Sequence, residues 1–305
     1  MPELDPLSRD FYEERRRKWR RSAFWRGFLV AAVIAGVISL FATGGPEVTD
    51  EIARVSVAGL ITDDPKRDAM LDRIADADRV KAVMVRITSP GGTTAGSEAL
   101  YQSLRSVAAK KPVVAVMSEL AASGGYITAI AADHIVARGN TLTGSIGVIM
   151  EYPNLTQVMA RLGVTMETVR SSELKAEPSP FRPTNPAARA IDEALIEESY
   201  QWFRGLVGER RGLDAPALDR VANGAVFTGR LALENGLVDE IGGETEAVAW
   251  LESRDAGLKD LPVRDWEVED DRSIWARLIA GMASTGGILG EISLLADPKL
   301  YSIGP

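Results

Sequence analysis

Ser123 stands in SELAASGGYITA (residues 118–129), directly after two alanines and directly before two glycines. Neighbours this small let another backbone approach the hydroxyl, as a nucleophile requires. A serine at the start of a helix is also a common capping residue, because its oxygen accepts an unpaired amide hydrogen. In strand-turn-helix sites the amide after the nucleophile commonly completes an oxyanion hole, and here that amide belongs to Gly124. We therefore predict that Ser123 is a nucleophile, with helix capping as the alternative.

A second source of amide donors precedes this serine. The segment ITSPGGTTAGSEAL (residues 87–100) is typical of an apolar strand that ends in Ser-Pro-Gly-Gly and is followed by a helix. Pro90 has no amide hydrogen, whereas Gly91 and Gly92 tolerate backbone angles that aim an N–H group outward. The turn is predicted to supply half of an oxyanion hole, with Gly92 preferred over Gly91. An ordinary strand-to-helix turn is the alternative.

The proton acceptor for Ser123 is not expected to be a histidine. His134 is the only histidine and follows Ser123 by 11 positions. With a helix between them, at ~1.5 Å per residue, the two would stand roughly 16 Å apart, beyond hydrogen-bond reach. His134 also begins the apolar run HIVAR, so we interpret it as structural. The sequence argues against a Ser-His-Asp triad.

A lysine amine is the remaining base, and it works only in its uncharged form, which burial or a positive neighbour favours. Lys175 lies in VRSSELKAEPSPFRPTNP (residues 169–186), a non-helical segment stiffened by prolines, where Ser171 or Ser172 is placed to hydrogen-bond a neutral amine. A solvated loop lysine is the alternative. Charged or helix-end surroundings make six other lysines poorer choices: Lys66, Lys81, Lys110, Lys111, Lys259 and Lys299.

Two serine motifs near Lys175 have simpler explanations. Ser172-x-x-Lys175 matches the pattern of β-lactamases and penicillin-binding proteins, but the S-D-N and K-T-G tripeptides that those sites need do not occur. Ser145 in TLTGSIGVI (residues 141–149) has glycines close on both sides, which predicts a backbone turn near the site rather than a second nucleophile.

The composition excludes other kinds of site. None of the 305 residues is a cysteine, so thiol nucleophiles, disulfides and thiolate metal sites are ruled out. A single histidine excludes zinc motifs such as H-E-x-x-H. The formal net charge is −8; residues 1–26 carry +3, which leaves −11 for the remainder and makes nucleic acid an unsuitable partner. No metal or organic cofactor is expected.

The N-terminal segment predicts a membrane anchor. Arginines and a lysine cluster in residues 15–26, ahead of an uncharged run at 27–45, with Phe24, Trp25 and Phe28 at the junction. About 20 apolar residues span a bilayer. We expect a single pass through the cytoplasmic (inner) membrane at residues 27–45, with the basic end (1–26) in the cytoplasm and residues from about 46 onward outside. A cleaved secretory signal and a buried core helix are the alternatives.

Beyond residue 46, short β-branched runs alternate with helical stretches, which predicts one α/β domain over residues 46–260. A long helix is expected from Pro186 to Arg211, ended by Gly212. Residues 261–305 form an apolar tail broken by glycines, whose packing the pattern leaves open. The expected strands are 52–61, 80–88, 112–118, 134–138 and 165–170, with helices between them at 67–77, at 95–111 and from about Ser123.

Together these features resemble the signal peptide peptidase A (protease IV) family of membrane-anchored serine peptidases, of the short, single-domain type. The likeness covers roughly residues 50 to 245, in the family's order and behind an N-terminal anchor. Five segments carry it: RITSPGG (86–92), SELAASGGYITAIAADHIVA (118–137), TLTGSIGVI (141–149), SSELKAEPSPFRP (171–183) and VFTGRLALENGLVDEIGG (226–243).

The resemblance implies a ClpP/crotonase-like fold and a Ser-Lys dyad, with Ser123 as nucleophile and Lys175 as general base. Gly124 and either Gly91 or Gly92, with Gly92 preferred, would be the oxyanion donors. It also implies a closed homo-oligomer, an octamer by analogy with the family, in which the lysine reaches the serine of an adjacent subunit. Released signal peptides or other unfolded hydrophobic peptides are the expected substrates, and no cofactor is needed.

Two other functions fit parts of the pattern. A crotonase-type acyl-CoA enzyme would share the fold and the oxyanion hole, but coenzyme A is scarce outside the cytoplasm. A catalytically silent assembly or scaffold protein would leave the coincidence of Ser123 and Lys175 unexplained.

Overall fold

The computed structural model describes residues 19, 24–32 and 49–268. The chain divides into two units, residues 1–50 and 51–305. In the first unit residues 24–32 are helical, and the ring of Trp25 meets those of Phe24 and Phe28 edge to face, at centroid distances of 6.3 and 5.8 Å. Among the described residues, no helix has the length and apolar character needed to cross a membrane. Residues 33–45 of the predicted anchor lie outside the described ones.

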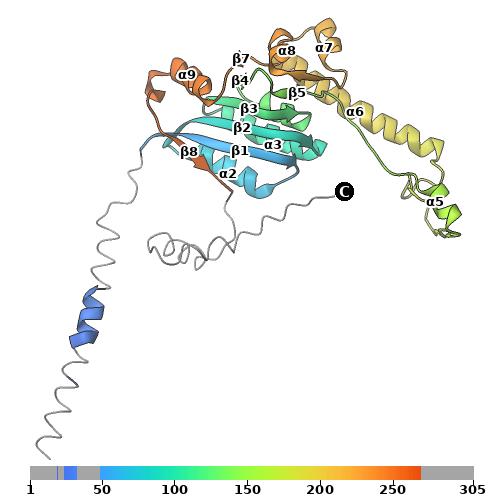
Figure 1. Cartoon of the computed structure of the whole chain (residues 1–305), viewed down its shortest axis with the longest axis horizontal. Helices are drawn as coiled ribbons and strands as arrows, with labels where there is room; N and C mark the ends of the chain where they lie inside the picture. The colour runs from blue at the N-terminus through green and yellow to red at the C-terminus, as the bar shows by residue number, and fades with distance from the viewer. Residues whose placement is uncertain (1–18, 20–23, 33–48, 269–305) are drawn as a thin grey trace, which may run out of the picture. The chain divides into compact units, whose positions relative to one another are not determined.

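The second unit is built on a mixed sheet in the order β6-β5-β3-β2-β1-β8, with β4 beside the first half of β3 and β7 beside β4 (Figure 1). All pairings are parallel except that of β5 with β6. The strands are β1 (Glu51–Ile61), β2 (Val80–Gly92), β3 (Val113–Ala122), β4 (His134–Ala137), β5 (Leu142–Gly144), β6 (Val226–Thr228), β7 (Glu240–Ile241) and β8 (Val263–Trp266).

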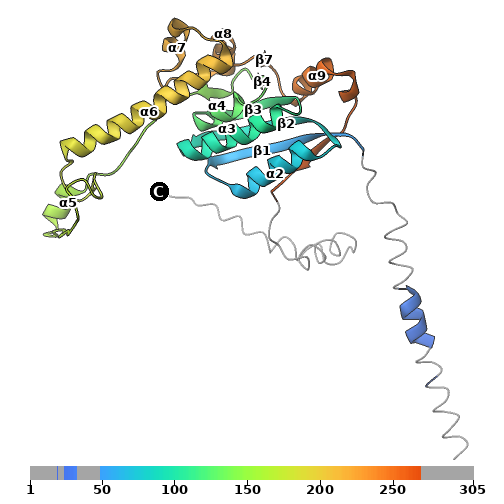
Figure 2. The ribbon, with the colours of Figure 1, turned by 180° about the vertical axis from the view of Figure 1, so that it is seen from behind.

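Helices cover both faces of this sheet. On one face lie α2 (Pro65–Asp76), α3 (Thr94–Ala108) and α4 (Gly124–Ala129), in front of the strands in Figure 2. On the other face α9 (Glu244–Arg254) and the short helix η1 (Ala256–Leu258) pack against buried residues of β1 to β4. Because β2 and β3 are covered on both sides, their sequences are nearly continuous apolar runs.

The longest helix, α6 (Pro186–Arg211), has the predicted bounds. The Asn185 side chain accepts the amide hydrogen of Ala187 at 2.9 Å, Pro186 occupies the first turn, and Gly212 ends the helix with φ of 62°. Phe203 and Val207, in the C-terminal half, are buried in the core. The N-terminal half extends away from the sheet toward α5 (Thr156–Arg161), as Figures 1 and 2 show. Two short helices, α7 (Ala215–Val221) and α8 (Gly229–Glu234), follow α6.

Three expectations about the elements need correction. The strand predicted at 165–170 is wrong: that segment is irregular and exposed, and Val169 has no neighbouring strand to pair with in the described chain. Strands β2 and β3 continue past residues 88 and 118, to Gly92 and Ala122. Strand β8 comes from the segment predicted as a tail, and pairs with β1. Residues 269–305 of that tail lie outside the described part.

Candidate active site

Ser123 stands at the turn between β3 and α4 in a strained backbone conformation. Its φ of 52° and ψ of −118° are values that few residues other than glycine adopt. Its amide donates to the carbonyl oxygen of Gly144 at 2.9 Å, and its carbonyl accepts the amides of Tyr126 and Ile127. The side chain makes no capping hydrogen bond. The backbone of Ser123 therefore closes the turn while its hydroxyl remains available.

Tyr126 holds α4 in place directly behind this turn. Its side chain is fully buried, and its hydroxyl donates to the carbonyl oxygen of Leu237 at 2.8 Å. Burial raises the pKa of Tyr126, so the hydroxyl stays protonated and remains a donor. This long-range bond fixes the helix whose first amide lies beside Ser123.

Gly91 approaches Ser123 because β2 and β3 are parallel neighbours that end at the same edge of the sheet. A Cβ atom on Gly91 would stand 2.9 Å from the Cβ of Ser123 and 2.9 Å from the amide nitrogen of Gly124, and the φ of Gly91 is 112°. Only glycine permits this approach. The Gly91 amide itself donates to Ser89 Oγ at 3.0 Å.

The next amide, of Gly92, is oriented differently. Thr93 donates its amide to Ile61 in β1 at 2.9 Å. Since successive amides of a strand point to opposite sides, the Gly92 N–H is turned away from β1. Its nitrogen lies 3.2 Å from the point where a Cβ atom on Gly124 would stand. Gly124 begins α4, so its own N–H has no partner within the helix. Two amide donors thus lie close together beside Ser123.

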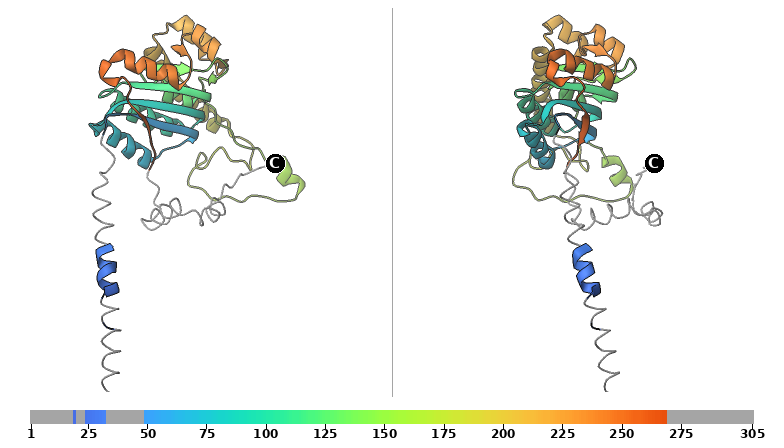
Figure 3. Two further views of the ribbon diagram at one scale, coloured as in Figure 1. Left: turned by 60° about the vertical axis from the view of Figure 1, so that its left-hand side comes forward. Right: turned by 90° about the vertical axis from the view of Figure 1, so that its left-hand side faces the viewer.

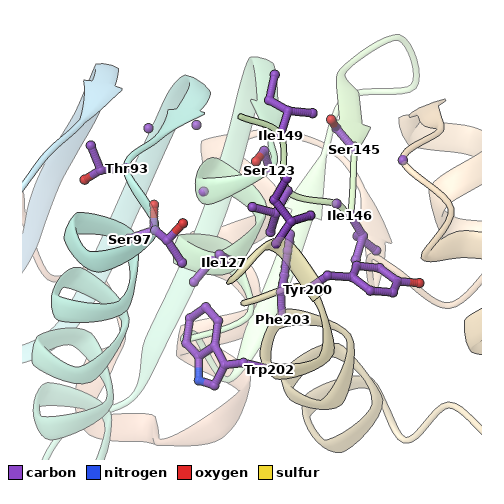
Figure 4. Close-up of a pocket in the computed structure, with 18 of the residues that line it drawn as sticks. Thr93, Ser97, Ser123, Ile127, Ser145, Ile146, Ile149, Tyr200, Trp202 and Phe203 are labelled. Carbon is purple, nitrogen blue, oxygen red and sulfur yellow. The ribbon is translucent and has the colours of Figure 1, made fainter. Parts of the chain in front are cut away.

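A pocket of ≈ 780 Å³ opens in front of these groups (Figure 4). Ser123 and the glycines form its polar side. Among the described residues that line it, Glu197 is the one carboxylate, and there is no lysine or histidine. Its apolar wall is formed by Ile127, Ile146, Ile149, Tyr200, Trp202 and Phe203, among others.

Several lining residues were not anticipated from the sequence. Tyr200, Trp202 and Phe203 come from α6, and they lie about eighty positions beyond Ser123 in the sequence. The only signal for them is the aromatic cluster in the C-terminal half of that helix. Ser97 in α3 is 1% exposed, and its hydroxyl has no hydrogen-bond partner among the described residues. The position of Ser97 at the pocket depends on how α3 packs against α4, and no local sequence motif predicts that packing.

Ser145 also lines the pocket, at a backbone turn as the sequence predicted. Gly144 and Ser145 have φ values of 82° and 51°, and the Ser145 amide donates to the carbonyl oxygen of Ala225 at 2.8 Å. The turn joins β5 to the segment that forms the rim of the pocket.

His134 has a structural environment, in line with the sequence analysis. Its ring stacks on that of Trp250 with a centroid distance of 4.7 Å, and its Nε2 lies 3.2 Å from a carboxylate oxygen of Glu240. It does not line the pocket of Ser123.

Lys175 does not meet Ser123 within one chain. It lies in the irregular segment between α5 and α6, is exposed, and is absent from the pocket wall, as are Ser171 and Ser172. The structure therefore brings Ser123, Gly91, Gly92 and Gly124 together and leaves the predicted base elsewhere in the same chain.

Comparisons with known proteins identify the family of this chain. Residues 105–259 match peptidase family S49. A Synechocystis protein described as a protease is 36% identical over 251 residues, which is 82% of this chain and 90% of the relative. Protease 4 of Haemophilus influenzae is 36% identical over 76% of this chain and 40% of its own length. The chloroplastic serine protease SPPA of Arabidopsis thaliana is 36% identical over 58% of this chain and 26% of its own length.

The match covers half of the chain and includes the turn of Ser123, and the Synechocystis relative matches over most of both sequences. The chain therefore belongs to peptidase family S49 and is a serine peptidase of the signal peptide peptidase A (protease IV) type.

Proposed function

We propose that Ser123 is the nucleophile of this peptidase and that the amides of Gly92 and Gly124 form its oxyanion hole. The observation that carries the proposal is the strained turn, which presents a serine without a capping hydrogen bond beside two closely spaced amides in a pocket. Donors that are fixed before the reaction stabilise a developing oxyanion without reorganisation. Gly91 serves a different purpose, because its missing side chain allows β2 to approach.

In the proposed reaction, Ser123 Oγ attacks the carbonyl carbon of the scissile peptide bond and passes its proton to Nζ of Lys175. The carbonyl oxygen becomes an oxyanion held by the two amides. Collapse of this intermediate breaks the C–N bond, and the lysine returns the proton to the leaving amine. A water molecule, deprotonated by the same lysine, then hydrolyses the acyl-enzyme and regenerates Ser123.

We infer that this lysine comes from a second copy of the chain. Figure 3 shows α5 and its flanking loops well away from the sheet that carries Ser123, and Lys175 belongs to that region. A site completed between subunits accounts for a pocket whose described walls contain a nucleophile and oxyanion donors but no lysine or histidine. Ser171 and Ser172 would accompany the lysine and hydrogen-bond its amine.

The arm that carries the lysine, residues 150–195, has an apolar surface suited to another copy. Val169 is fully exposed and Leu162 is 70% exposed within one chain. Exposed apolar groups gathered on one segment favour a protein interface. The others are Met150, Tyr152, Val158, Val164, Met166, Leu174, Phe181, Ile191 and Leu195. A closed homo-oligomer, an octamer by family resemblance, would bury them.

Unfolded hydrophobic peptides, such as released signal peptides, suit the apolar wall of the pocket. The proposed organisation is a cytoplasmic segment (1–26), a membrane anchor (27–45), an extracytoplasmic peptidase domain of the ClpP/crotonase-like class (46–260) and a C-terminal tail (261–305). The basic cluster ahead of an uncharged run supports this orientation in the inner membrane.

Subunit complementation tests both the dyad and its origin in two chains. Ser123→Ala and Lys175→Ala are each expected to be inactive on an apolar peptide. When the two variants are co-expressed, random assembly pairs an intact serine with an intact neighbouring lysine in about one site in four, so about a quarter of the activity should return. Variants assembled separately and mixed afterwards, without subunit exchange, provide the control and should stay inactive.

Two results would contradict the proposal. If either single variant kept wild-type turnover, the dyad would be wrong; if both were inactive and co-expression restored nothing, the sharing between chains would be wrong. A fluorophosphonate should label the wild type and not Ser123→Ala. No labelling of the wild type would contradict Ser123 as the activated nucleophile.

A further inference from the structure

The segment that carries Lys175 is closed around a single carboxylate. Arg170 and Arg182, at the two ends of this segment, both donate to the same oxygen of Glu177, Oε1, and the distance from Arg182 Nη2 is 2.8 Å. The other oxygen, Oε2, accepts the amide of Ser179 at 3.1 Å. The side chain of Glu177 is 3% exposed, whereas those of both arginines are 26% exposed. The Glu177 carboxylate therefore lies inside the loop, and the two guanidinium groups lie nearer the surface of the loop.

We propose that Glu177 is a positioning residue, which holds the 170–182 loop in the conformation that presents Lys175. The inference rests on the proposed role of Lys175 as the general base. Glu177 does not touch the reacting atoms in this scheme and acts only through the loop.

The part of this loop around Lys175 has few other restraints within one chain. Residues 170–182 contain no helix or strand, and residues 171–176 are all exposed. Two turns carry only long hydrogen bonds: the Lys175 amide donates to the Ser172 carbonyl oxygen, and the Glu177 amide donates to that of Leu174, each at 3.3 Å. Irregular exposed backbone with few buried contacts opens at low free-energy cost. The Glu177 side chain, which joins both ends of the loop, thus restrains where Lys175 lies.

The charge arrangement favours the same role. The hydrogen bond from Arg170 lowers the pKa of Glu177, and the charge of Arg182 acts in the same direction against the effect of burial, so the carboxylate stays ionised. Charge-assisted hydrogen bonds are stronger and more directional than neutral ones. The loop is also tied to the start of α5, because the Leu155 amide donates to the carbonyl oxygen of Pro180 at 2.7 Å.

The chain offers a matched control for a test. Glu173 and Glu177 each lie two positions from Lys175, on opposite sides. Glu173 is exposed and has no ion pair within the described part of the chain. Glu173→Gln and Glu177→Gln therefore remove the same charge at the same sequence distance from the lysine, but only the second removes the contacts that close the loop.

Steady-state kinetics of the assembled full-length enzyme on an apolar peptide should separate the two. We expect Glu177→Gln to lower kcat about tenfold to a hundredfold, since small displacements of a catalytic group have effects of this size. KM should change little, because the pocket is untouched. Glu173→Gln should retain wild-type kcat. Glu177→Asp, which keeps the charge on a shorter stem, should recover part of the loss.

The outcomes distinguish this inference from the proposed function. If Lys175→Ala were as active as the wild type, the base would be misassigned and the inference would fall with it. If Lys175→Ala were inactive while Glu177→Gln matched Glu173→Gln in kcat, the positioning role alone would be wrong. Should Glu177→Gln fail to assemble, Glu177→Asp decides: a kcat equal to that of Glu173→Gln in the assembled enzyme overturns the proposal, and a lower one supports it.

Discussion

The hydroxyl oxygen of Ser97 lies 2.2 Å from the point where a Cβ atom on Gly124 would stand. A methyl group at position 124 would therefore push Ser97 aside or shift the first turn of α4, and with it the proposed oxyanion donor.

Gly124→Ala should lower kcat about a hundredfold, the effect of losing one oxyanion donor, while the protein still folds and assembles. The double variant Ser97→Ala/Gly124→Ala should be more active than Gly124→Ala, because the clashing oxygen is gone. A double-mutant cycle on kcat measures this coupling. If the effects of the two substitutions on kcat were strictly additive, the close contact between Ser97 and Gly124 would have no influence on the Gly124 amide.

The backbone strain at Ser123 should have a measurable effect on the free energy of unfolding. Its φ of 52° suits glycine better than any residue with a Cβ atom. Ser123→Gly should therefore be more stable than Ser123→Ala by about 1 kcal/mol, although neither has a hydroxyl and both should be inactive. Denaturant unfolding of the two variants side by side gives the difference. Equal stability would mean that the turn is not strained.

The exposed apolar residues of the arm should matter for assembly and not for folding of the subunit. Val169→Glu places a charge on a fully exposed position. It is expected to reduce the oligomeric fraction in analytical ultracentrifugation and to lower activity in parallel. Leu233→Glu, at a partly exposed position of α8 outside the arm, is the control and should remain assembled. Unchanged assembly of the Val169 variant would argue against the arm as an interface.

The contact of Asp239 with Arg211 predicts a pH dependence of stability. Burial tends to raise the pKa of Asp239, but hydrogen bonds from Arg211 and from the Ile135 amide outweigh it, and the pKa is lowered. A lowered native pKa means that the ionised group contributes stability in full above its unfolded pKa of roughly 3.9. This contribution is lost as the pH falls through the native value.

Asp239→Asn should accordingly be less stable than the wild type at neutral pH, with a deficit that shrinks below about pH 4. Unfolding curves between pH 3 and pH 7 provide the measurement. Asp219→Asn is the control, because that carboxylate bonds Arg204 on the surface and is 72% exposed. A deficit for Asp239→Asn that stayed constant down to pH 3 would contradict the assignment.

The local parts of this protein follow from its sequence. Helix α6 has the predicted bounds because Pro186 and Gly212 act on their own backbone angles and need no distant partner. The strands that became β1 to β4 are recognisable as apolar β-branched runs. Ser123 stands out because its small neighbours are adjacent in the chain. The same local reasoning failed at residues 165–170, since a β-branched run becomes a strand only where another backbone pairs with it.

The tertiary structure decided what surrounds Ser123. Parallel pairing of β2 with β3 brings Gly91 and Gly92 to a serine more than thirty positions away. The packing of α6 adds Tyr200 and Phe203 to the pocket wall, and the direction in which the arm leaves the sheet separates Lys175 from that pocket. These placements depend on contacts between residues far apart in the chain, which no local pattern of residue types encodes.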